Sequence, residues 1–154
     1  MNSLFSKITV SVVVVLLSLI TWGQDPVVNL KGQTTNASGQ KLGGVTVAVK
    51  RGGTVVQSVT TASNGKFSKL EFPCGYVYEV VFSKSGYVSK TIKINTEDNY
   101  FPEEMFEQYP FDMPIGMVEA KPDVDYSPIT SKPIGLIEIG PSYCLLYTSD
   151  AADD

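Results

Sequence analysis

From residue 27 onward, the sequence alternates apolar and polar side chains over short runs that are separated by glycine, asparagine and serine. Successive side chains of a β-strand point to opposite faces, so each such run has one apolar face. In the run VTVAVK, for example, Val45, Val47 and Val49 share one face. No stretch has a clear helical period. The alternation therefore predicts half-buried antiparallel strands and an all-β fold.

The breaks between these runs predict tight turns. The Gly-Gly pair at 52–53 and the Asn-Gly pair at 64–65 accept the positive φ angles of a two-residue loop. Each pair is therefore expected to close a β-hairpin. Residues 85–87, Ser-Gly-Tyr, are expected to turn between two later strands.

Large side chains follow these turns at positions predicted to face inward. Phe67 is expected to cap one end of the core, and the run YVYEVVF is expected to place Tyr76, Tyr78 and Phe82 on its inner face. Each large side chain contributes about 1.5–3 kcal/mol when fully buried, so such a core needs neither a metal nor a disulfide. The residues assigned to turns and core, rather than to catalysis, are Asn64, Gly65, Phe67, Tyr78, Phe82, Gly86 and Tyr87.

The N-terminus has the pattern of a secretory signal peptide. Lys7 precedes an uncharged run at 8–22, which is shorter than the about 20 apolar residues that a helix needs to cross a bilayer. Small residues at Thr21 and Gly23 suit signal peptidase. We therefore expect residues 1–23 to be removed, with no permanent membrane span afterwards. The expected location is secreted or periplasmic, or associated with the outer membrane.

The composition excludes several kinds of catalytic site. The chain has no histidine, which removes the commonest general base and the commonest zinc ligand. Its two cysteines, Cys74 and Cys144, would allow one disulfide in an oxidising compartment. Acidic pairs at 103–104 and at 123 and 125 lack the ligand density of a calcium loop. We expect no catalytic residue, no cofactor and no metal.

The two halves of the chain differ in charge. Residues 25–95 contain nine lysines or arginines and three acidic residues, whereas residues 96–143 contain ten acidic residues and two lysines. The acidic stretch at 96–111 also carries several aromatic rings. It is either a solvated linker or a segment that docks on the basic strands or on a partner, with Phe106 and Phe111 as candidate contacts. The lysines near Tyr87 form too small a patch to predict nucleic-acid binding.

A short pattern occurs twice in the acidic half. MPIGMVEA at 113–120 and KPIGLIEI at 132–139 share P-I-G, two apolar residues and glutamate. Unless the repeat arose by chance, it predicts two short strands, each entered by a proline that fixes the backbone and bent by a glycine.

The last residues, CLLYTSDAADD at 144–154, have no helical or strand period. They resemble a translated sequencing adapter, because codons such as TGT CTC TTA TAC ACA TCT GAC encode Cys144 to Asp150. The alternative is an acidic tail. In the adapter interpretation, Cys144 is not biological, Cys74 has no intrachain partner, and the native sequence continues beyond Tyr143.

Several motifs in their order resemble a known family. They are G-Q-T at Gly32, G-x-x-L-x-G-V-x-V-x-V at 39–49, T-x-x-N-G-x-F at 61–67 and Y-x-V-x-F-x-K-x-G-Y at 78–87. This order is similar to the carboxypeptidase regulatory-like domain, although Gly43 stands where that family commonly has proline. The resemblance covers residues 27–95. It implies a non-catalytic, seven-stranded antiparallel β-sandwich of the prealbumin (transthyretin) type at 24–96, followed by an acidic, aromatic-containing extension with short strands at 97–143.

These observations favour a non-enzymatic secreted or periplasmic module that acts in binding or structural interaction at the bacterial envelope. Its expected partner is an envelope protein or polysaccharide, and not a nucleic acid. Two alternatives remain open. The resemblance also fits the N-terminal extension of a TonB-dependent outer-membrane receptor. A carbohydrate-binding module would need an exposed aromatic platform, for which Trp22, Tyr76 and Tyr87 are the candidates.

Overall fold

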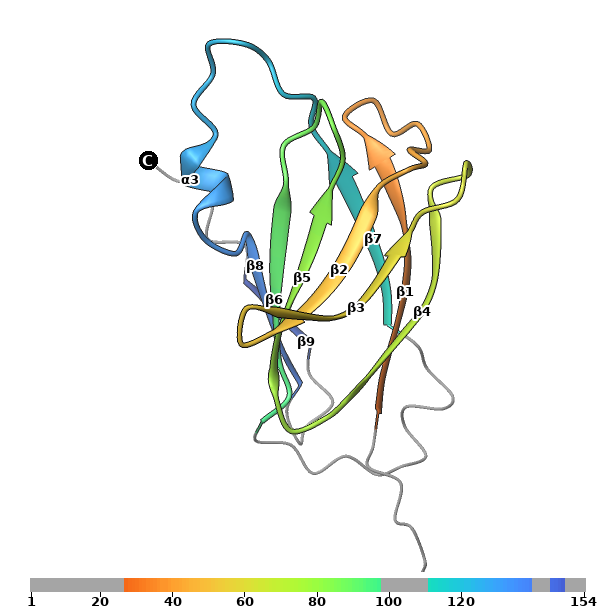
Figure 1. Ribbon diagram of the computed structural model, residues 1–154, viewed down its shortest axis with the longest axis vertical. Coiled ribbons are helices and arrows are strands. Elements are labelled where there is room, and N and C mark those ends of the chain that lie inside the picture. The colour runs from red at the N-terminus through yellow and green to blue at the C-terminus, as the bar shows by residue number, and fades with distance from the viewer. Residues whose placement is uncertain (1–26, 98–110, 140–144, 149–154) are drawn as a thin grey trace, which may run out of the picture.

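The computed structural model describes residues 27–97, 111–139 and 145–148, and it forms a β-sandwich of two facing sheets (Figure 1). The elements before residue 97 are β1 (Val27–Asn36), β2 (Thr46–Arg51), β3 (Thr54–Thr60), β4 (Lys66–Pro73), β5 (Val77–Ser83) and β6 (Lys90–Asn95). The later elements are β7 (Phe111–Met117), α3 (Ser127–Thr130), β8 (Gly135–Ile139) and β9 (Leu145–Thr148). One sheet has the order β4-β1-β7, and the other has the order β3-β2-β5-β6-β8-β9. The all-β sandwich predicted from the sequence is confirmed.

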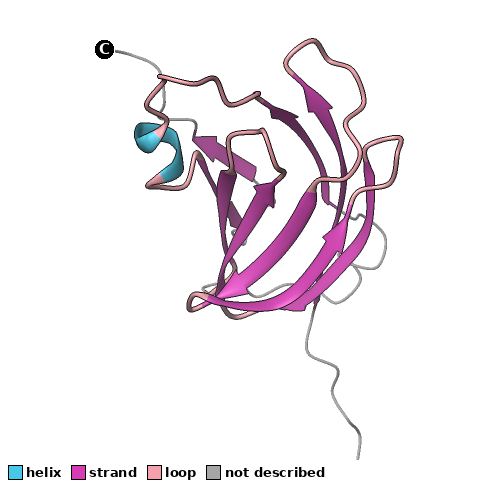
Figure 2. Ribbon diagram, turned by 45° about the horizontal axis from the view of Figure 1, so that its top comes forward, coloured by secondary structure: helices cyan, strands magenta, loops and turns pink. Residues whose placement is uncertain are grey.

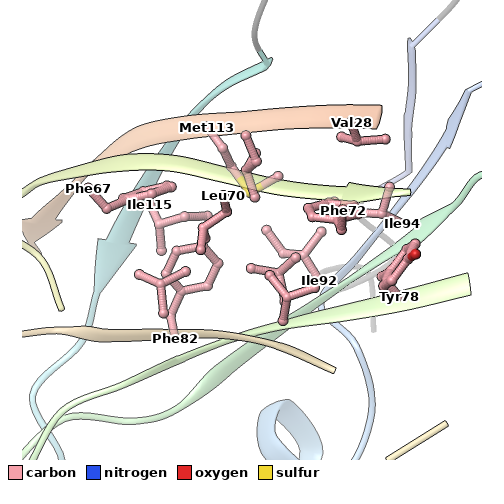
Figure 3. Packing of buried hydrophobic residues seen from close by; sticks show 14 of the residues in the cluster. Val28, Phe67, Leu70, Phe72, Tyr78, Phe82, Ile92, Ile94, Met113 and Ile115 are labelled. Carbon is pink, nitrogen blue, oxygen red and sulfur yellow. The ribbon is translucent and has the colours of Figure 1, made fainter. Parts of the chain in front are cut away.

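The hydrophobic core fills the space between the two sheets. Figure 3 shows Tyr78, Phe82 and Ile92 extending from the six-stranded sheet toward the side chains of the three-stranded sheet. Buried residues of the three-stranded sheet are Val28, Leu30, Phe67, Leu70, Phe72, Met113, Ile115 and Met117. In β2 the buried residues Val47 and Val49 alternate with more exposed ones, as the sequence predicts for a half-buried strand.

The two predicted hairpin turns have different roles. Gly52 and Gly53 have φ angles of 56° and 81° and connect β2 to its antiparallel neighbour β3, which confirms a hairpin there. The hairpin prediction at Asn64-Gly65 is wrong, because β3 belongs to the six-stranded sheet and β4 to the three-stranded sheet. The Asn-Gly preference fixes the local backbone of this turn. It does not fix which strand the following residues pair with, and here the chain crosses between sheets.

The sandwich is also not wholly antiparallel, and its strand count differs from the expectation. Six strands, rather than seven, lie in the described residues 27–97, and β7 and β8 pair in parallel with β1 and β6, respectively. Parallel neighbours require a long connection, and both β7 and β8 are reached only after many intervening residues. Side chains alternate in the same way in parallel and antiparallel strands, so the sequence pattern could not distinguish the two kinds of pairing.

The acidic half contributes directly to the sandwich. Met113, Ile115 and Met117 of β7 are buried in the core that β1 to β6 form. The sequence-based boundary between 24–96 and 97–143 therefore does not separate two cores. The repeat prediction also needs correction, because Pro114 lies inside β7 rather than at its entry. A proline is tolerated there because β7 is an edge strand, where one side of the backbone needs no ladder partner.

The remaining described segments lie at the margin of the six-stranded sheet. Figure 2 shows the short helix α3 beside that sheet, and β8 follows it in the chain. β9 pairs antiparallel with β8, although the sequence of 144–154 shows no strand period. Residues 1–23, Trp22, Phe106 and Cys144 lie outside the described residues. Within the described residues, no helix is long and apolar enough to cross a membrane.

Candidate functional site

The turn at Asn64 and Gly65 is held by contacts with β1. The Asn64 side-chain oxygen accepts a hydrogen bond from the Lys66 amide at 3.0 Å, and the Gly65 carbonyl accepts one from the Thr34 amide at 2.8 Å. Gly65 has a φ of 75°, and a Cβ atom there would collide with the Thr34 carbonyl oxygen. Both residues therefore position the crossing between sheets, and glycine is required by both conformation and space.

Phe67 and Phe82 join the two sheets inside the core. Their rings pack edge to face, with centroids 6.0 Å apart and planes at 65°. Phe67 belongs to β4 and Phe82 to β5, so this contact links the three-stranded sheet to the six-stranded one. Edge-to-face pairs of this kind contribute about 0.5–1.5 kcal/mol beyond the buried area.

Gly86 and Tyr87 form a second connection between the sheets, at the turn between β5 and β6. The Gly86 carbonyl accepts a hydrogen bond from the Ala120 amide at 2.9 Å, and the Tyr87 hydroxyl donates one to a carboxylate oxygen of Glu119 at 3.2 Å. Residues 118–120 follow β7, so this turn ties the acidic half of the chain to the six-stranded sheet. Lys90 adds a hydrogen bond from its Nζ atom to the Gly116 carbonyl at 2.6 Å.

A cluster of aromatic and cationic groups, of which Arg51 and Tyr76 are exposed, lies at the other end of β5. The guanidinium of Arg51 sits 4.4 Å from the centre of the Tyr76 ring, and Tyr76 packs edge to face against Tyr78 at 6.1 Å. Tyr76 is 43% exposed, which corrects the expectation that it faces the core. Tyr78 is buried, contacts Phe72, and donates a hydrogen bond from its hydroxyl to the Pro73 carbonyl at 2.6 Å. We call Arg51, Tyr76 and Tyr78 the Arg51–Tyr76 cluster.

The structure separates the two tyrosines that the sequence nominated for a carbohydrate platform. Tyr76 precedes the first residue of β5, and Tyr87 follows its last residue. A strand of this length extends for about 20 Å, so the two rings cannot contact one sugar. The Arg51 guanidinium also covers one face of the Tyr76 ring, which leaves only the other face for stacking.

Cys74 lies next to this cluster and is a poor nucleophile. Its side chain is partly buried against the core, and burial raises the pKa of its thiol from 9.0 to about 11. The thiol is therefore protonated at neutral pH, whereas both nucleophilic attack and metal binding require the thiolate.

The described residues contain no group of three or more metal-binding side chains. Of the acidic pair at 123 and 125, Asp125 accepts hydrogen bonds at 2.8 Å from both the amide and the hydroxyl of Ser127, at the start of α3. These bonds lower the pKa of Asp125. The carboxylate thus stabilises the loop before α3. Glu103 and Glu104 lie outside the described residues, and so does the side chain of Phe111.

The sequence did not identify Arg51 or Lys90 as contact residues. Arg51 reaches Tyr76 because β2 and β5 are neighbours, with Arg51 opposite Tyr78 in their register. Lys90 reaches Gly116 because the segment after β7 folds back on the β5–β6 turn. Both contacts depend on strand pairing between distant residues, for which the local pattern carries no signal.

Comparison with known proteins agrees with this fold. Residues 29–101 match the carboxypeptidase regulatory-like domain, which has a prealbumin-like β-sandwich fold. The resemblance based on the sequence motifs is therefore confirmed. Domains of this family are commonly extracellular or periplasmic. None of the curated proteins matches the chain.

Among solved structures, one similar chain is 3-chlorocatechol 1,2-dioxygenase from Rhodococcus opacus 1CP. The two chains are 12% identical, with a TM-score of 0.45 over 65% of this chain and 62% of the dioxygenase. This chain thus covers less than two thirds of the dioxygenase chain. A similarity of this size carries no information about activity.

Proposed function

Because residues 29–101 match the carboxypeptidase regulatory-like domain, we propose that the protein is a non-enzymatic module of the bacterial envelope. It works in the secreted or periplasmic space by binding a partner protein. The proposal rests on one observation: the residues that the sequence analysis selected have structural roles. Phe67, Tyr78 and Phe82 fill the core, while the turns at 64–65 and 86–87 connect the sheets. A rigid sandwich of this kind suits the presentation of a binding surface.

The Arg51–Tyr76 cluster is the surface that this proposal assigns to binding. Arginine and tyrosine are enriched among residues that dominate protein interfaces, because they combine apolar area with directed hydrogen bonds. Val55, which lies opposite Lys50 in the β2–β3 hairpin, is 51% exposed. An exposed cation beside apolar side chains favours a partner surface that carries carboxylates next to apolar groups.

The test uses the purified secreted chain and envelope proteins solubilised from the bacterium that produces it. The expected result is saturable binding that Arg51→Ala and Tyr76→Ala each weaken by about tenfold, which corresponds to about 1.4 kcal/mol. Tyr87→Ala is the matched control, because it removes a tyrosine at the opposite end of β5 and should leave binding unchanged. Equal losses in all three variants would reject the assigned surface.

The non-enzymatic part of the proposal has a separate test. The purified chain is incubated with peptide and ester substrates, and turnover is measured for the original chain and for single substitutions. No turnover is expected. A hydrolysis rate that disappears on replacement of one side chain would overturn the proposal. N-terminal sequencing of the exported protein should begin at Gln24.

Carbohydrate binding is a second candidate because Tyr76 is 43% exposed and Arg51 lies over one face of its ring. Calorimetric titration with envelope polysaccharides tests it directly. Heat of binding that Tyr76→Ala abolishes and Tyr87→Ala preserves would favour this candidate over a protein partner.

A further inference from the structure

The edge strand β3 has an unusual composition. Its sequence, TVVQSVT, carries no charged residue and no proline. β3 is the last strand of its sheet, and within the described residues its ladder partner is β2 alone. Val55 and Val56 are 51% and 45% exposed. An exposed edge of this kind presents unpaired amide and carbonyl groups along one side of the backbone.

The edges of the three-stranded sheet differ from β3. β4 carries Lys66, Lys69, Glu71 and Pro73, and β7 carries Asp112 and Pro114. Charged side chains and proline on an edge strand oppose pairing with another chain, because they are costly to desolvate or lack an amide donor. The other edge of the six-stranded sheet is β9, which lies in the adapter-like residues. Among the described residues, β3 is therefore the edge strand with the fewest features that oppose pairing. It contacts β4 through a side chain, because the Glu71 amide donates a hydrogen bond to the Gln57 side-chain oxygen at 3.0 Å.

We propose that β3 pairs with β3 of a second copy of this chain, antiparallel and about a two-fold axis at Ser58. The segment from Val56 to Thr60 then forms the ladder, with Val56 opposite Thr60 and Gln57 opposite Val59. Each of these pairs is uncharged, so self-pairing brings no like charges together. The pairing joins the two six-stranded sheets into one continuous sheet. The interface is isologous, as a two-fold axis requires.

The register within the sheet favours this segment. β2 and β3 pair regularly from Gln57 to Thr60, whereas the register shifts at Val56, between the partners Gln57 and Val55. Ser58 lies opposite Ala48 and is exposed, so its side chain is free of the core. The regular stretch thus supplies four of the five residues of the proposed ladder, and Val56, at the shift, is the fifth.

The charges near β3 favour the antiparallel arrangement over the parallel one. Lys50 and Arg51 lie at the β2–β3 hairpin, at one end of the strand. An antiparallel pair places the two hairpins at opposite ends of the ladder, at a separation of about 25 Å from the strand rise, which exceeds the Debye length. A parallel pair would place the basic hairpins side by side.

This dimer does not depend on the proposed envelope partner, because it uses the outer edge of β3 rather than the Arg51–Tyr76 cluster. A ladder of this length buries less than the about 1,200 Å² of a standard interface, so the expected dissociation constant is micromolar to millimolar.

Sedimentation equilibrium of the chain without its predicted signal peptide tests the proposal. A monomer–dimer equilibrium is expected, and Ser58→Lys should weaken it by about tenfold or more, because two lysines then face each other across the axis. Ser68→Lys is the matched control, since Ser68 is an exposed serine on the other edge strand, β4. A chain that stays monomeric up to about 1 mM overturns the proposal. Equal weakening by both substitutions also overturns it.

A cysteine pair provides a second measurement that does not weaken the interface. The axis brings the two copies of residue 58 to a Cβ separation of about 4.5–5.5 Å, which a disulfide can bridge with a small backbone shift. Ser58→Cys should therefore form a covalent dimer under mild oxidation faster than Ser68→Cys does. Cross-linking at equal rates would contradict pairing at β3.

Discussion

β7 and β8 carry the same short pattern but differ in how the sandwich uses it. In β7 the pattern begins inside the strand, which ends at Met117, and Ile115 and Met117 are buried. In β8 the strand begins only at the glycine, Gly135, and Leu136 is half-buried. Each strand adds in parallel to one sheet, β7 to β1 and β8 to β6. The comparison shows that the pattern specifies a strand, while its neighbours decide how much of it the core buries.

The largest expected effect of a single substitution comes from the equivalent apolar positions, Met117 and Leu136, in the two occurrences of the P-I-G pattern. Met117→Ala should lower the free energy of unfolding by about 2–5 kcal/mol, because Met117 is fully buried and its loss leaves a cavity. Leu136→Ala should cost less than about 1.5 kcal/mol, because Leu136 is only partly buried. Urea unfolding of both variants measures the difference. Similar losses would show that β8 belongs to the core as fully as β7.

The next prediction concerns the acidic residues that lead into β7. If the rings at Phe106 and Phe111 dock on the sandwich, their replacement by serine together should lower stability by about 1.5–3 kcal/mol for each ring fully buried. Exposed ion pairs contribute only about 0.2–1 kcal/mol each, so adding about 0.5 M salt should lower the thermal midpoint only slightly. An unchanged midpoint in the double variant would identify the segment as a free linker.

Lys90 contacts one of the two P-I-G patterns. Its Nζ atom donates a hydrogen bond to the carbonyl of Gly116, the glycine of the pattern in β7. Lys90→Met should cost about 1 kcal/mol at neutral pH through loss of this hydrogen bond. Burial lowers the pKa of Lys90 below its usual 10.5. Between the lowered pKa and 10.5, the unfolded chain binds more protons than the folded chain, so Lys90 makes stability rise with pH there.

The measurement is the stability difference between the original chain and Lys90→Met, followed by urea unfolding from pH 7 to 10.5. Subtraction removes the opposing effects of Cys74 and the tyrosines, which both variants share. The difference should grow with pH in favour of the original chain. A difference that stays constant would show that Lys90 is not desolvated.

The smallest expected effect concerns Glu119 and Glu138, the glutamates that end the two occurrences of the P-I-G pattern. Glu119 accepts a hydrogen bond from Tyr87, and both groups lie at the surface. A double-mutant cycle with Tyr87→Phe and Glu119→Ala should give a coupling of about 0.2–0.5 kcal/mol. The same cycle with Glu138→Ala should give none, because Glu138 lies opposite Asn95 on β6. A measurable coupling between Tyr87 and Glu138 would show that the two glutamates have equivalent surroundings.

The candidate binding surface was only partly predictable from sequence. The motif that contains Tyr78 identified a core strand, and Tyr78 and Phe82 are indeed buried there. Tyr76, two residues earlier, was expected on the same face but is exposed under the Arg51 guanidinium, because it precedes the strand and lies outside the alternation. Local periodicity applies only within a strand, and residues at strand ends follow the loops around them.

The sequence by itself determined the local structure: alternation within strands, the Gly-Gly hairpin at 52–53, and the core positions of strand residues such as Tyr78 and Phe82. These follow from backbone preference and side-chain burial, which act over a few residues. Only the tertiary structure decided the crossing at Asn64-Gly65, the parallel pairing of β7 and β8, and the Lys90 bond to Gly116. The physical reason is that strand edges offer the same hydrogen-bonding groups to many possible partners. The choice among them depends on how the whole core is filled, which no short segment encodes.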